Sequence, residues 1–373
     1  MPGGRGKGHM HHRDVMTKQE RVMRTLRFEE TDRVPLYDIF QNDAIIEHYA
    51  GRPVDFKGGA DTTALAVGRV LDMTRMITGP QTSREFTSED GFQHRVQRWT
   101  SWITGRPFHD VDELVEWVKR RILAENARTF GSEYAGEMLR HIEHCRGLFA
   151  QADPTGRDDP TVLVIESGVG LDYMYHVAGM ELFTELCCFH PGVMEEWFES
   201  VLGAELRRVA AIADPRYIPV ALTYSDIAHK TGTLFSPQWL RQYWKPRLKR
   251  LNDAWHVRET VCIFHSDGNL WGVMDDLVDA GIDGLNPIEV LAGMTPKEVR
   301  HRYPQLVLTG GIDVSQLLCM GTPDEVRRAC REAVADTGGR GYFMGSTTEL
   351  HWEAKLENAM AMFETAWAGW GRG

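Results

Sequence analysis

Short apolar runs alternate with longer amphipathic segments from about Thr161 onward, and this alternation constrains the fold more than any other feature of the chain. Each run is nearly all apolar, as is typical of strands that are buried on both faces. Strands that alternate with helices on this scale predict a parallel sheet. The predicted strands are 161–166, 217–224, 260–264, 282–287, 305–310 and 341–345. The predicted helices are 191–213, 237–256, 270–280, 295–303, 322–336 and 356–370.

The remaining segments complete a barrel. An opening helix, 18–26, precedes a first strand at 34–40, and an eighth strand is expected within 68–77. Segment 82–103 differs, because Asp90-Gly91 between two alternating polar and apolar stretches indicates an antiparallel hairpin. We therefore predict a single (β/α)8 TIM-like barrel domain over residues 16–373, with a small antiparallel hairpin insertion.

Composition narrows the classes of partner. The 373-residue chain has a net charge of −11, which argues against nucleic acid or an anionic membrane as its main partner. It contains six cysteines without a C-x-x-C pair and no apolar run of about 18–20 residues, so a cytoplasmic protein with reduced thiols is expected. Residues 1–15 are rich in Gly, Arg and His and are expected to form a disordered leader. Order is expected from Met16, where Thr17 and Glu20 suit a capping box.

Carboxylates and imidazoles follow almost every predicted strand, beside small residues that let the backbone turn sharply. In such barrels the chemistry lies at the carboxyl ends of the strands. A single carboxylate there is often only a helix N-cap, but five such strand ends together favour an active site. The residues in question are Glu166, Tyr224, Asp226, His229, His265, Asp267, Asn269, Glu289, Asp313 and Glu349.

His265 and Asp267 are the centre of this predicted site. They lie two residues apart, so on an extended segment both side chains face the same side. Such a pair can share a metal ion, or the carboxylate can orient the imidazole. A hydrogen-bonded structural histidine at the rim of the barrel is the alternative.

Several sequence blocks resemble the uroporphyrinogen-decarboxylase-like superfamily, which includes porphyrin decarboxylases and corrinoid-dependent methyltransferases. The resemblance runs through nearly the whole chain from Met16 and implies the same barrel. The blocks are 17–22 with 31–36, His265-Ser266-Asp267-Gly268-Asn269, 281–289, Gly310-Gly311-Ile312-Asp313 and 357–360.

Two departures from the family pattern bear on the reaction. The arginine-rich stretch that holds porphyrin carboxylates is replaced by residues 37–44, which contain two aspartates and no arginine. The thiol-activating members bind zinc through His-x-Cys and a later cysteine, whereas this chain has His265-x-Asp267 and, near the later position, Thr348. The resemblance therefore leaves a zinc site of hard ligands, His265, Asp267 and Glu289, as an expectation.

The expected function is that of a methyltransferase. It would move a methyl group from a small O-methyl or N-methyl substrate to a corrinoid carried by a separate partner protein, with possible help from zinc. Asp267, Asp226, Glu166 and His229 are the candidate catalytic residues. Tyr224, Asn269, Asp313 and Glu349 are the candidate substrate-binding residues.

Two other functions stay open. A non-porphyrin decarboxylase could use Asp226 or Asp38 to stabilise a cationic intermediate, with Tyr224 to orient it. A barrel that only binds a ligand is disfavoured, because burying so many charged strand ends without a task costs stability. Trp367 and Trp370 could form a homodimer patch, with packing inside the monomer as the alternative.

Overall fold

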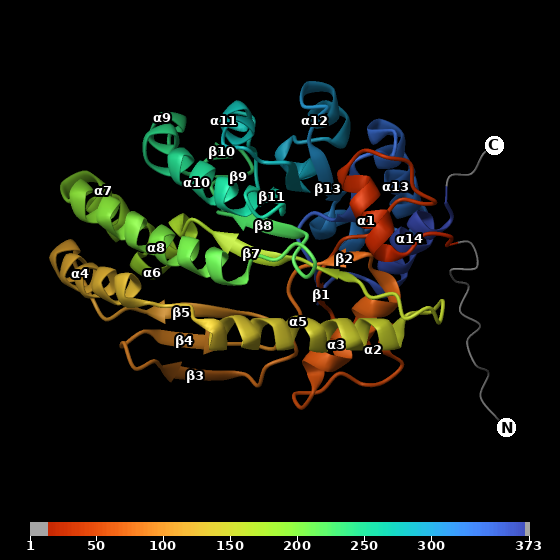
Figure 1. Ribbon diagram of the computed structural model, residues 1–373, viewed down its shortest axis with the longest axis horizontal. Helices are drawn as coiled ribbons and strands as arrows, with labels where there is room; N and C mark the ends of the chain where they lie inside the picture. The colour runs from red at the N-terminus through yellow and green to blue at the C-terminus, as the bar shows by residue number, and fades with distance from the viewer. Residues whose placement is uncertain (1–13, 370–373) are drawn as a thin grey trace.

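Eight parallel strand positions form the centre of the fold. The computed structural model, shown in Figure 1, describes residues 14–369. Six of the strands pair in one sheet in the order β14-β13-β12-β11-β8-β7, so the predicted parallel sheet is confirmed. Their bounds, in chain order, are β7 Ile165–Gly168, β8 Val220–Tyr224, β11 Val261–His265, β12 Gly284–Ile288, β13 Val307–Ile312 and β14 Tyr342–Ser346.

Short bridges close this sheet into a barrel. Leu36 pairs in parallel with Met344 of β14, and Tyr37 pairs with Met73 of β2 (Met73–Thr74). β2 pairs in turn with β6 (Val162–Leu163), which leads through one residue into β7. The eighth strand expected within 68–77 is therefore β2, and the 34–40 strand meets its neighbours only at two bridge residues. Beyond the bridges, β1 (Phe40–Gln41) pairs with β15 (Leu350–His351), and β9 (Ala228–His229) pairs with β10 (Gly232–Thr233).

Helices surround the barrel, and their ends follow capping rules. Thr17 caps the first helix, and Thr322 with Glu325 forms a full capping box on α13. The helix predicted at 237–256 contains a π-helical turn at Leu240–Trp244. The helices are α1 Lys18–Leu26, α2 Asp43–Ala50, α3 Gly59–Val70, α4 Val111–Ala127, α5 Ser132–Ala152, α6 Leu171–Ala178, α7 Met180–Phe189, α8 Pro191–Ile212, α9 Pro237–Trp239, α10 Lys245–His256, α11 Met274–Asp279, α12 Pro296–Arg302, α13 Pro323–Thr337 and α14 Leu356–Trp367.

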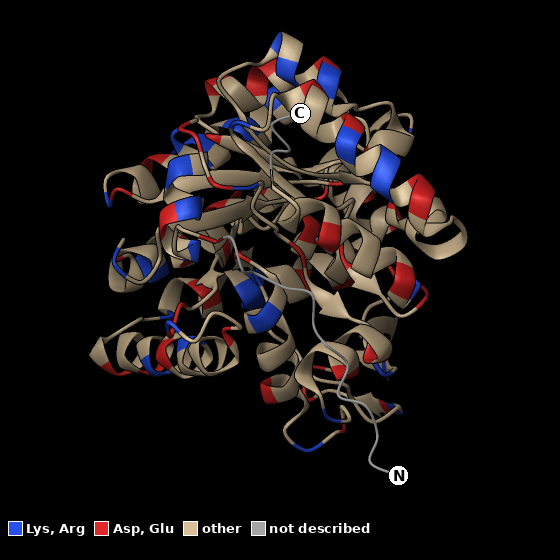
Figure 2. Ribbon diagram, turned by 90° about the vertical axis from the view of Figure 1, so that its right-hand side faces the viewer, with Lys and Arg blue, Asp and Glu red and all other residues tan. Residues whose placement is uncertain are grey.

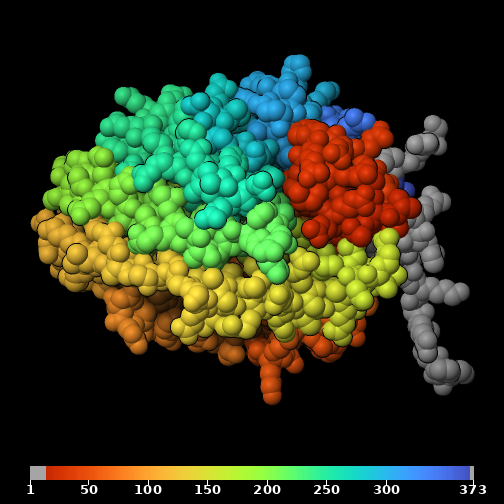
Figure 3. All heavy atoms as spheres, viewed as in Figure 1, coloured from red at the N-terminus to blue at the C-terminus, as the bar shows by residue number. Residues whose placement is uncertain are grey.

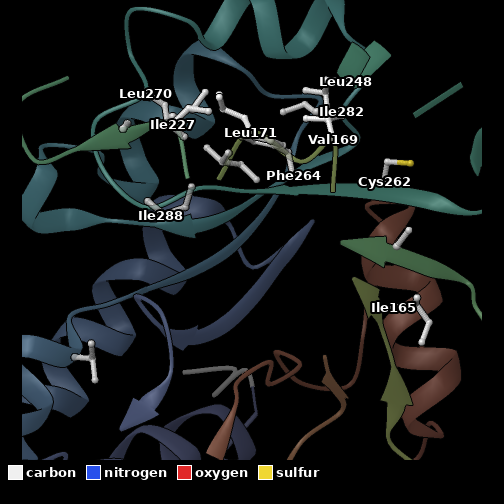
Figure 4. Close-up of a cluster of buried hydrophobic side chains, with 14 of the residues drawn as sticks. Ile165, Val169, Leu171, Ile227, Leu248, Cys262, Phe264, Leu270, Ile282 and Ile288 are labelled. Carbon is white, nitrogen blue, oxygen red and sulfur yellow. The ribbon is translucent and has the colours of Figure 1, made fainter. Parts of the chain in front are cut away.

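The apolar core has two layers because successive strand residues point to opposite sides. Inward residues such as Leu222 and Ile263 fill the barrel together with Val307 and Phe343. Outward residues pack against the helices, and Figure 4 shows Phe264 of β11 in this outer layer, near Leu171. Strands that are apolar on both sides are the physical reason for the continuous apolar runs in the sequence.

The insertion is larger than the predicted hairpin. It is a three-stranded antiparallel sheet, β3 (Arg84–Thr87), β4 (Gln93–Val96) and β5 (Ser101–Gly105), beside the barrel (Figure 1). Phe92 joins it to α4 through an edge-on contact with Trp117, with 5.6 Å between ring centroids.

A buried ionic network fixes the start of the barrel. Arg21 of α1 and Arg33 both bind Asp72, at 2.6 Å and 2.7 Å, and all three side chains are almost completely buried. Burial by itself would raise the pKa of Asp72, but the two guanidinium groups lower it to about 2. The carboxylate therefore stays charged and links α1 to the first two strand positions. The N-terminal segment accordingly lies beside the C-terminal part of the chain (Figure 3).

The chain ends also bear on two sequence predictions. Residues 1–13 of the predicted leader lie outside the described residues, whereas Asp14 forms an ion pair with Arg33. Trp370 of the suggested dimer patch is likewise outside them, and Trp367 packs against Tyr49 and Phe363. Acidic and basic side chains are interspersed over the outer helices (Figure 2). Within residues 14–369, no helix is both long enough and apolar enough to span a membrane.

Candidate active site at the mouth of the barrel

The alternation of side chains along the strands determines which residues face the mouth of the barrel. Val164, Leu222, Ile263, Val307 and Phe343 point into the barrel. The residue two positions further along each strand faces the same way, one layer nearer the mouth. Tyr37 and Met73 also point into the barrel. Arg75 is two residues after Met73 and therefore faces the mouth. The resulting layer is Arg75, Glu166, Tyr224, His265, Asn286, Thr309 and Gly345, and Tyr37 lies one layer below it, beside Met73.

His265 ends β11 as a neutral imidazole. Its Nδ1 lies 2.7 Å from the amide oxygen of Asn286 on the next strand, so Nδ1 carries the proton. Burial, reinforced by the charge of Arg75, lowers the pKa of His265 to about 4. The lone pair on Nε2 is therefore free, and Nε2 lies 3.8 Å from Oδ1 of Asp226.

Asp267 lies among three other acidic side chains. Burial, together with repulsion from Asp226, Glu289 and Glu349, raises the pKa of Asp267 to about 8. Its Oδ1 is buried without a hydrogen-bond partner. Asp267 is thus a neutral carboxylic acid near neutral pH, with one oxygen available to a ligand.

The backbone around Gly268 holds these acids in place. Gly268 donates its N–H to Glu289 at 2.6 Å, and the N–H of Asp267 bonds Asp226 at 3.2 Å. Gly268 has φ of 95°, and a Cβ atom there would come within 2.6 Å of the backbone of Ala228. Glycine is therefore required at this turn for the carboxyl groups to converge.

Arg75 brings a positive charge into the mouth and was missed from the sequence. It forms an ion pair with Glu166 at 3.1 Å, and its side chain is 12% exposed. Its Nε is buried without a partner, as is the hydroxyl of Tyr37 nearby. The signal that could have identified Arg75 is its position two residues after an inward-facing residue of β2, the strand hidden in the sequence.

Asp38 is a second buried acid, at the end of the first strand position. It accepts hydrogen bonds from the backbone and the hydroxyl of Ser346 and from the N–H of Ile39. Burial raises the pKa of Asp38 to about 7, against these hydrogen bonds. The charge of Glu349 acts on this carboxyl group as well as on Asp267.

A cavity of about 270 Å³ adjoins the mouth beside Glu166 and Tyr224. Gly168 leaves room for the Tyr224 ring, since a Cβ atom there would lie 3.0 Å from the ring. Arg208 lines the cavity and binds both Glu205 and the backbone oxygen of Glu166. The predicted residues Glu166 and Tyr224 thus share one wall.

Three predicted residues do not offer free groups to the mouth. Asp313 accepts hydrogen bonds from three backbone N–H groups and caps the turn that follows β13, the alternative noted for any strand-end carboxylate. Both ends of the Asn269 amide bind local backbone, at Ala292 and Trp271. His229 is exposed on the β9–β10 ribbon and accepts a bond from Thr231. The predicted roles of Asp313 and Asn269 in substrate binding and of His229 in catalysis stay predictions.

The predicted zinc ligands do not fit a metal as they stand. Within residues 14–369, His265, Asp267 and Glu289 are not among the groups of three ligand atoms that lie within 4.8 Å of one another. Glu289 accepts a hydrogen bond from the N–H of Gly268. A tetrahedral zinc site needs three or four converging ligands. Zinc therefore remains a prediction from the resemblance, and we assign no chemical step to it.

The barrel and its acid-lined mouth define a parallel α/β-barrel enzyme scaffold, and comparison with known proteins places it in a family. The sequence model of the uroporphyrinogen decarboxylase (URO-D) family matches residues 174–368, more than half of the chain. The chain belongs to the uroporphyrinogen decarboxylase family.

One solved structure shares the fold over nearly the whole chain. A methyltransferase from Methanosarcina mazei superimposes with a TM-score of 0.68 at 17% identity, covering 94% of this chain and 98% of that one. A B12-independent methionine synthase from Shewanella sp. W3-18-1 aligns with a TM-score of 0.39 at 10% identity, covering 89% and 97%. No curated protein matches the chain in sequence. At 17% identity, the likeness to the Methanosarcina mazei structure establishes the barrel fold alone.

Proposed function

We propose that this protein is a methyltransferase that takes a methyl group from a small O-methyl or N-methyl substrate. The observation that carries the proposal is the Asp267 carboxyl group, buried at the mouth with one oxygen that has no partner. A methyl group leaves without its bonding electrons, so the oxygen or nitrogen that loses it keeps the pair and needs a proton. A carboxylic acid that stays protonated near neutral pH can supply that proton.

The surrounding residues have separate tasks in this proposal. Asp226, Glu289 and Glu349 keep Asp267 protonated by their negative charge. His265, fixed by Asn286, offers Nε2 as a hydrogen-bond acceptor to the substrate. Glu166 and Tyr224 line the cavity that adjoins the mouth, where the rest of the substrate would lie.

The methyl acceptor would come from outside the chain. In the overall reaction the bond from carbon to oxygen or nitrogen breaks, a bond from carbon to the acceptor forms, and the proton of Asp267 moves to the leaving atom. We propose a corrinoid bound to a separate protein as the acceptor, as the sequence resemblance implies. The name of the Methanosarcina mazei relative agrees with methyl transfer, although its likeness extends only to the fold.

The acidic mouth disfavours a porphyrinogen as the substrate. That substrate carries many carboxylates, which need several guanidinium groups. Here Arg75 is already paired with Glu166, and Asp226, Glu289 and Glu349 lie nearby. A polycarboxylate would therefore be repelled.

The test is methyl transfer to cob(I)alamin by the purified protein, across a panel of methoxyaromatics and methylamines. We expect the wild type to methylate cobalamin with at least one compound. Asp267→Asn should lower the rate by about 100-fold or more, since general acid catalysis contributes a factor of that size. Asp324→Asn, which changes a side chain that is 94% exposed, should leave the rate unchanged. Methylation with no compound, or full activity in Asp267→Asn, would refute the proposal.

Decarboxylation of a non-porphyrin acid is the second candidate, and Arg75 is the observation that favours it. Its Nε has no partner and could hold a single substrate carboxylate. Asp38 or Asp226 would then stabilise a cationic intermediate. Release of carbon dioxide without any corrinoid would favour this function over methyl transfer.

A further inference from the structure

Two hydrogen-bond acceptors face each other across a short gap in the mouth. His265 Nε2 and Asp226 Oδ1 lie 3.8 Å apart. Neutral His265 has one ring proton, which it donates from Nδ1 to the amide oxygen of Asn286. No hydrogen atom therefore lies between Nε2 of His265 and Oδ1 of Asp226. Asp226 Oδ1 also accepts the N–H of Asp267 at 3.2 Å and keeps a second lone pair, so a donor placed between the two atoms would bond both Nε2 and Oδ1. The gap therefore fits a ligand atom that carries a proton.

The charge around the gap indicates the sign of that ligand. Asp226, Glu289 and Glu349 are close enough to repel Asp267, while Arg75 is the cation that acts on the same carboxyl group. Arg75 in turn is paired with Glu166. Even with Asp267 neutral, the mouth therefore carries an excess of negative charge, which a cationic ligand would offset.

The floor of the mouth gives a second, independent indication of a ligand. The hydroxyl groups of Tyr37 and Thr309 are buried, with side chains 3% and 0% exposed, and neither has a hydrogen-bond partner. Both side chains point into the barrel, Thr309 in the layer of His265 and Tyr37 one layer below it, as the alternation along their strands requires. Buried polar groups without partners are costly, and a ligand with polar contacts would satisfy them. The aromatic ring of Tyr37 also suits the methyl groups of a small cation.

We propose that the substrate of this site is a protonated N-methyl amine that keeps at least one N–H, and that this N–H lies between His265 Nε2 and Asp226 Oδ1. The inference rests on the proposed methyl transfer and chooses the amine over the ether. When a protonated amine loses its methyl group, the bonding pair stays on nitrogen and a neutral amine leaves, so for this substrate Asp267 keeps its proton and donates a hydrogen bond to the leaving nitrogen. A bare metal ion fits less well, because within residues 14–369 these two atoms belong to no group of three potential ligands. A quaternary ammonium has the charge but lacks the proton.

The experiment measures binding without any methyl acceptor. Trimethylammonium, tetramethylammonium and tert-butanol are titrated separately into the protein by calorimetry. Trimethylammonium carries both a positive charge and an N–H, tetramethylammonium carries the charge alone, and tert-butanol is a neutral hydrogen-bond donor. We expect trimethylammonium to bind at least about tenfold more tightly than either of the others. Equal binding of tetramethylammonium, or tighter binding of tert-butanol, would overturn the inference.

Variants locate the site. Asp226→Asn should weaken trimethylammonium binding by about tenfold or more, because a charged acceptor becomes neutral. Glu349→Gln should weaken it less, since this residue supplies charge only, and it serves as the second variant if Asp226→Asn does not fold by circular dichroism. Asp324→Asn should bind as the wild type does. Unchanged binding in both Asp226→Asn and Glu349→Gln, or zinc that binds this site and displaces the amine, would refute the proposal.

The outcome also separates this inference from the proposed function. If trimethylammonium binds as expected but no methyl group reaches cobalamin, the ligand class stands and the methyltransferase proposal falls. If an ether is demethylated while trimethylammonium fails to bind, the methyltransferase proposal stands and the ligand class is wrong.

Discussion

Replacing Asp267 by Asn should stabilise the protein, by an amount that grows with pH. The carboxyl group is protonated in the folded chain up to a pH of about 8, whereas in the unfolded chain it ionises near its ordinary pKa of 3.8. Between these values, unfolding releases a proton, so rising pH favours the unfolded state. The stability contributed by the neutral acid is complete below pH 3.8 and is lost as the pH rises toward 8. Asparagine has a similar shape and no charge, so it removes this loss.

The size of the effect follows from the pKa difference. Each pH unit in the window changes the free energy of unfolding by up to about 1.4 kcal/mol, so the advantage of Asp267→Asn should widen by up to about 2.7 kcal/mol from pH 5 to pH 7. Urea unfolding at both pH values measures it. Asp324→Asn controls for the removal of one exposed charge. A variant that is less stable than the wild type at pH 7, or whose advantage does not change with pH, would show that Asp267 is not a buried neutral acid.

Three further predictions test other parts of the structure. Asp72→Asn should lower the free energy of unfolding by about 3–5 kcal/mol, because two buried guanidinium groups lose their shared counter-charge, and urea denaturation at pH 7 checks this. Gly345→Ala should lower the free energy of unfolding by about 1–3 kcal/mol, because the new Cβ would lie 1.9 Å from the carbonyl oxygen of Tyr37, where β14 meets the first strand position. An unchanged melting temperature would contradict this. Asn286→Asp should raise the pKa of His265 by at least about one unit, because a carboxylate replaces a neutral acceptor; NMR titration of the imidazole in wild type and variant measures the difference.

The fold could be predicted from the sequence where the strands were long and apolar on both sides. β8 and β11 are clear because every residue from Val220 to Thr223 and from Cys262 to His265 is buried. The strand at Leu36–Tyr37 and β2 each pair through only one or two residues. Such short strands show no recognisable hydrophobic periodicity in the sequence. The location of the eighth strand could be predicted only because a closed barrel requires it.

The candidate site was harder to predict, because strand-end carboxylates look alike in sequence. Asp313 and Glu349 both follow strands, yet the first binds backbone N–H groups and the second repels Asp267 across the mouth. Which one caps a turn depends on the backbone direction after the strand, which the residue type does not encode. Arg75 was missed for the related reason that its strand was hidden.

The first and last described residues of the chain both lie close to Asp32. The same fold could therefore form from a chain in which the elements follow one another in a different order. Asp32 accepts the N–H of Val15, and a Cβ atom on Gly369 would lie 3.6 Å from its carbonyl oxygen. A peptide linker between these points would add little loop-closure entropy. New ends could then open in the exposed turn between β3 and β4, in the sheet beside the barrel (Figure 1). A circularly permuted chain should therefore fold into the same barrel. In that chain β14 would precede its neighbour at Leu36 in the sequence, whereas in the natural chain it follows it.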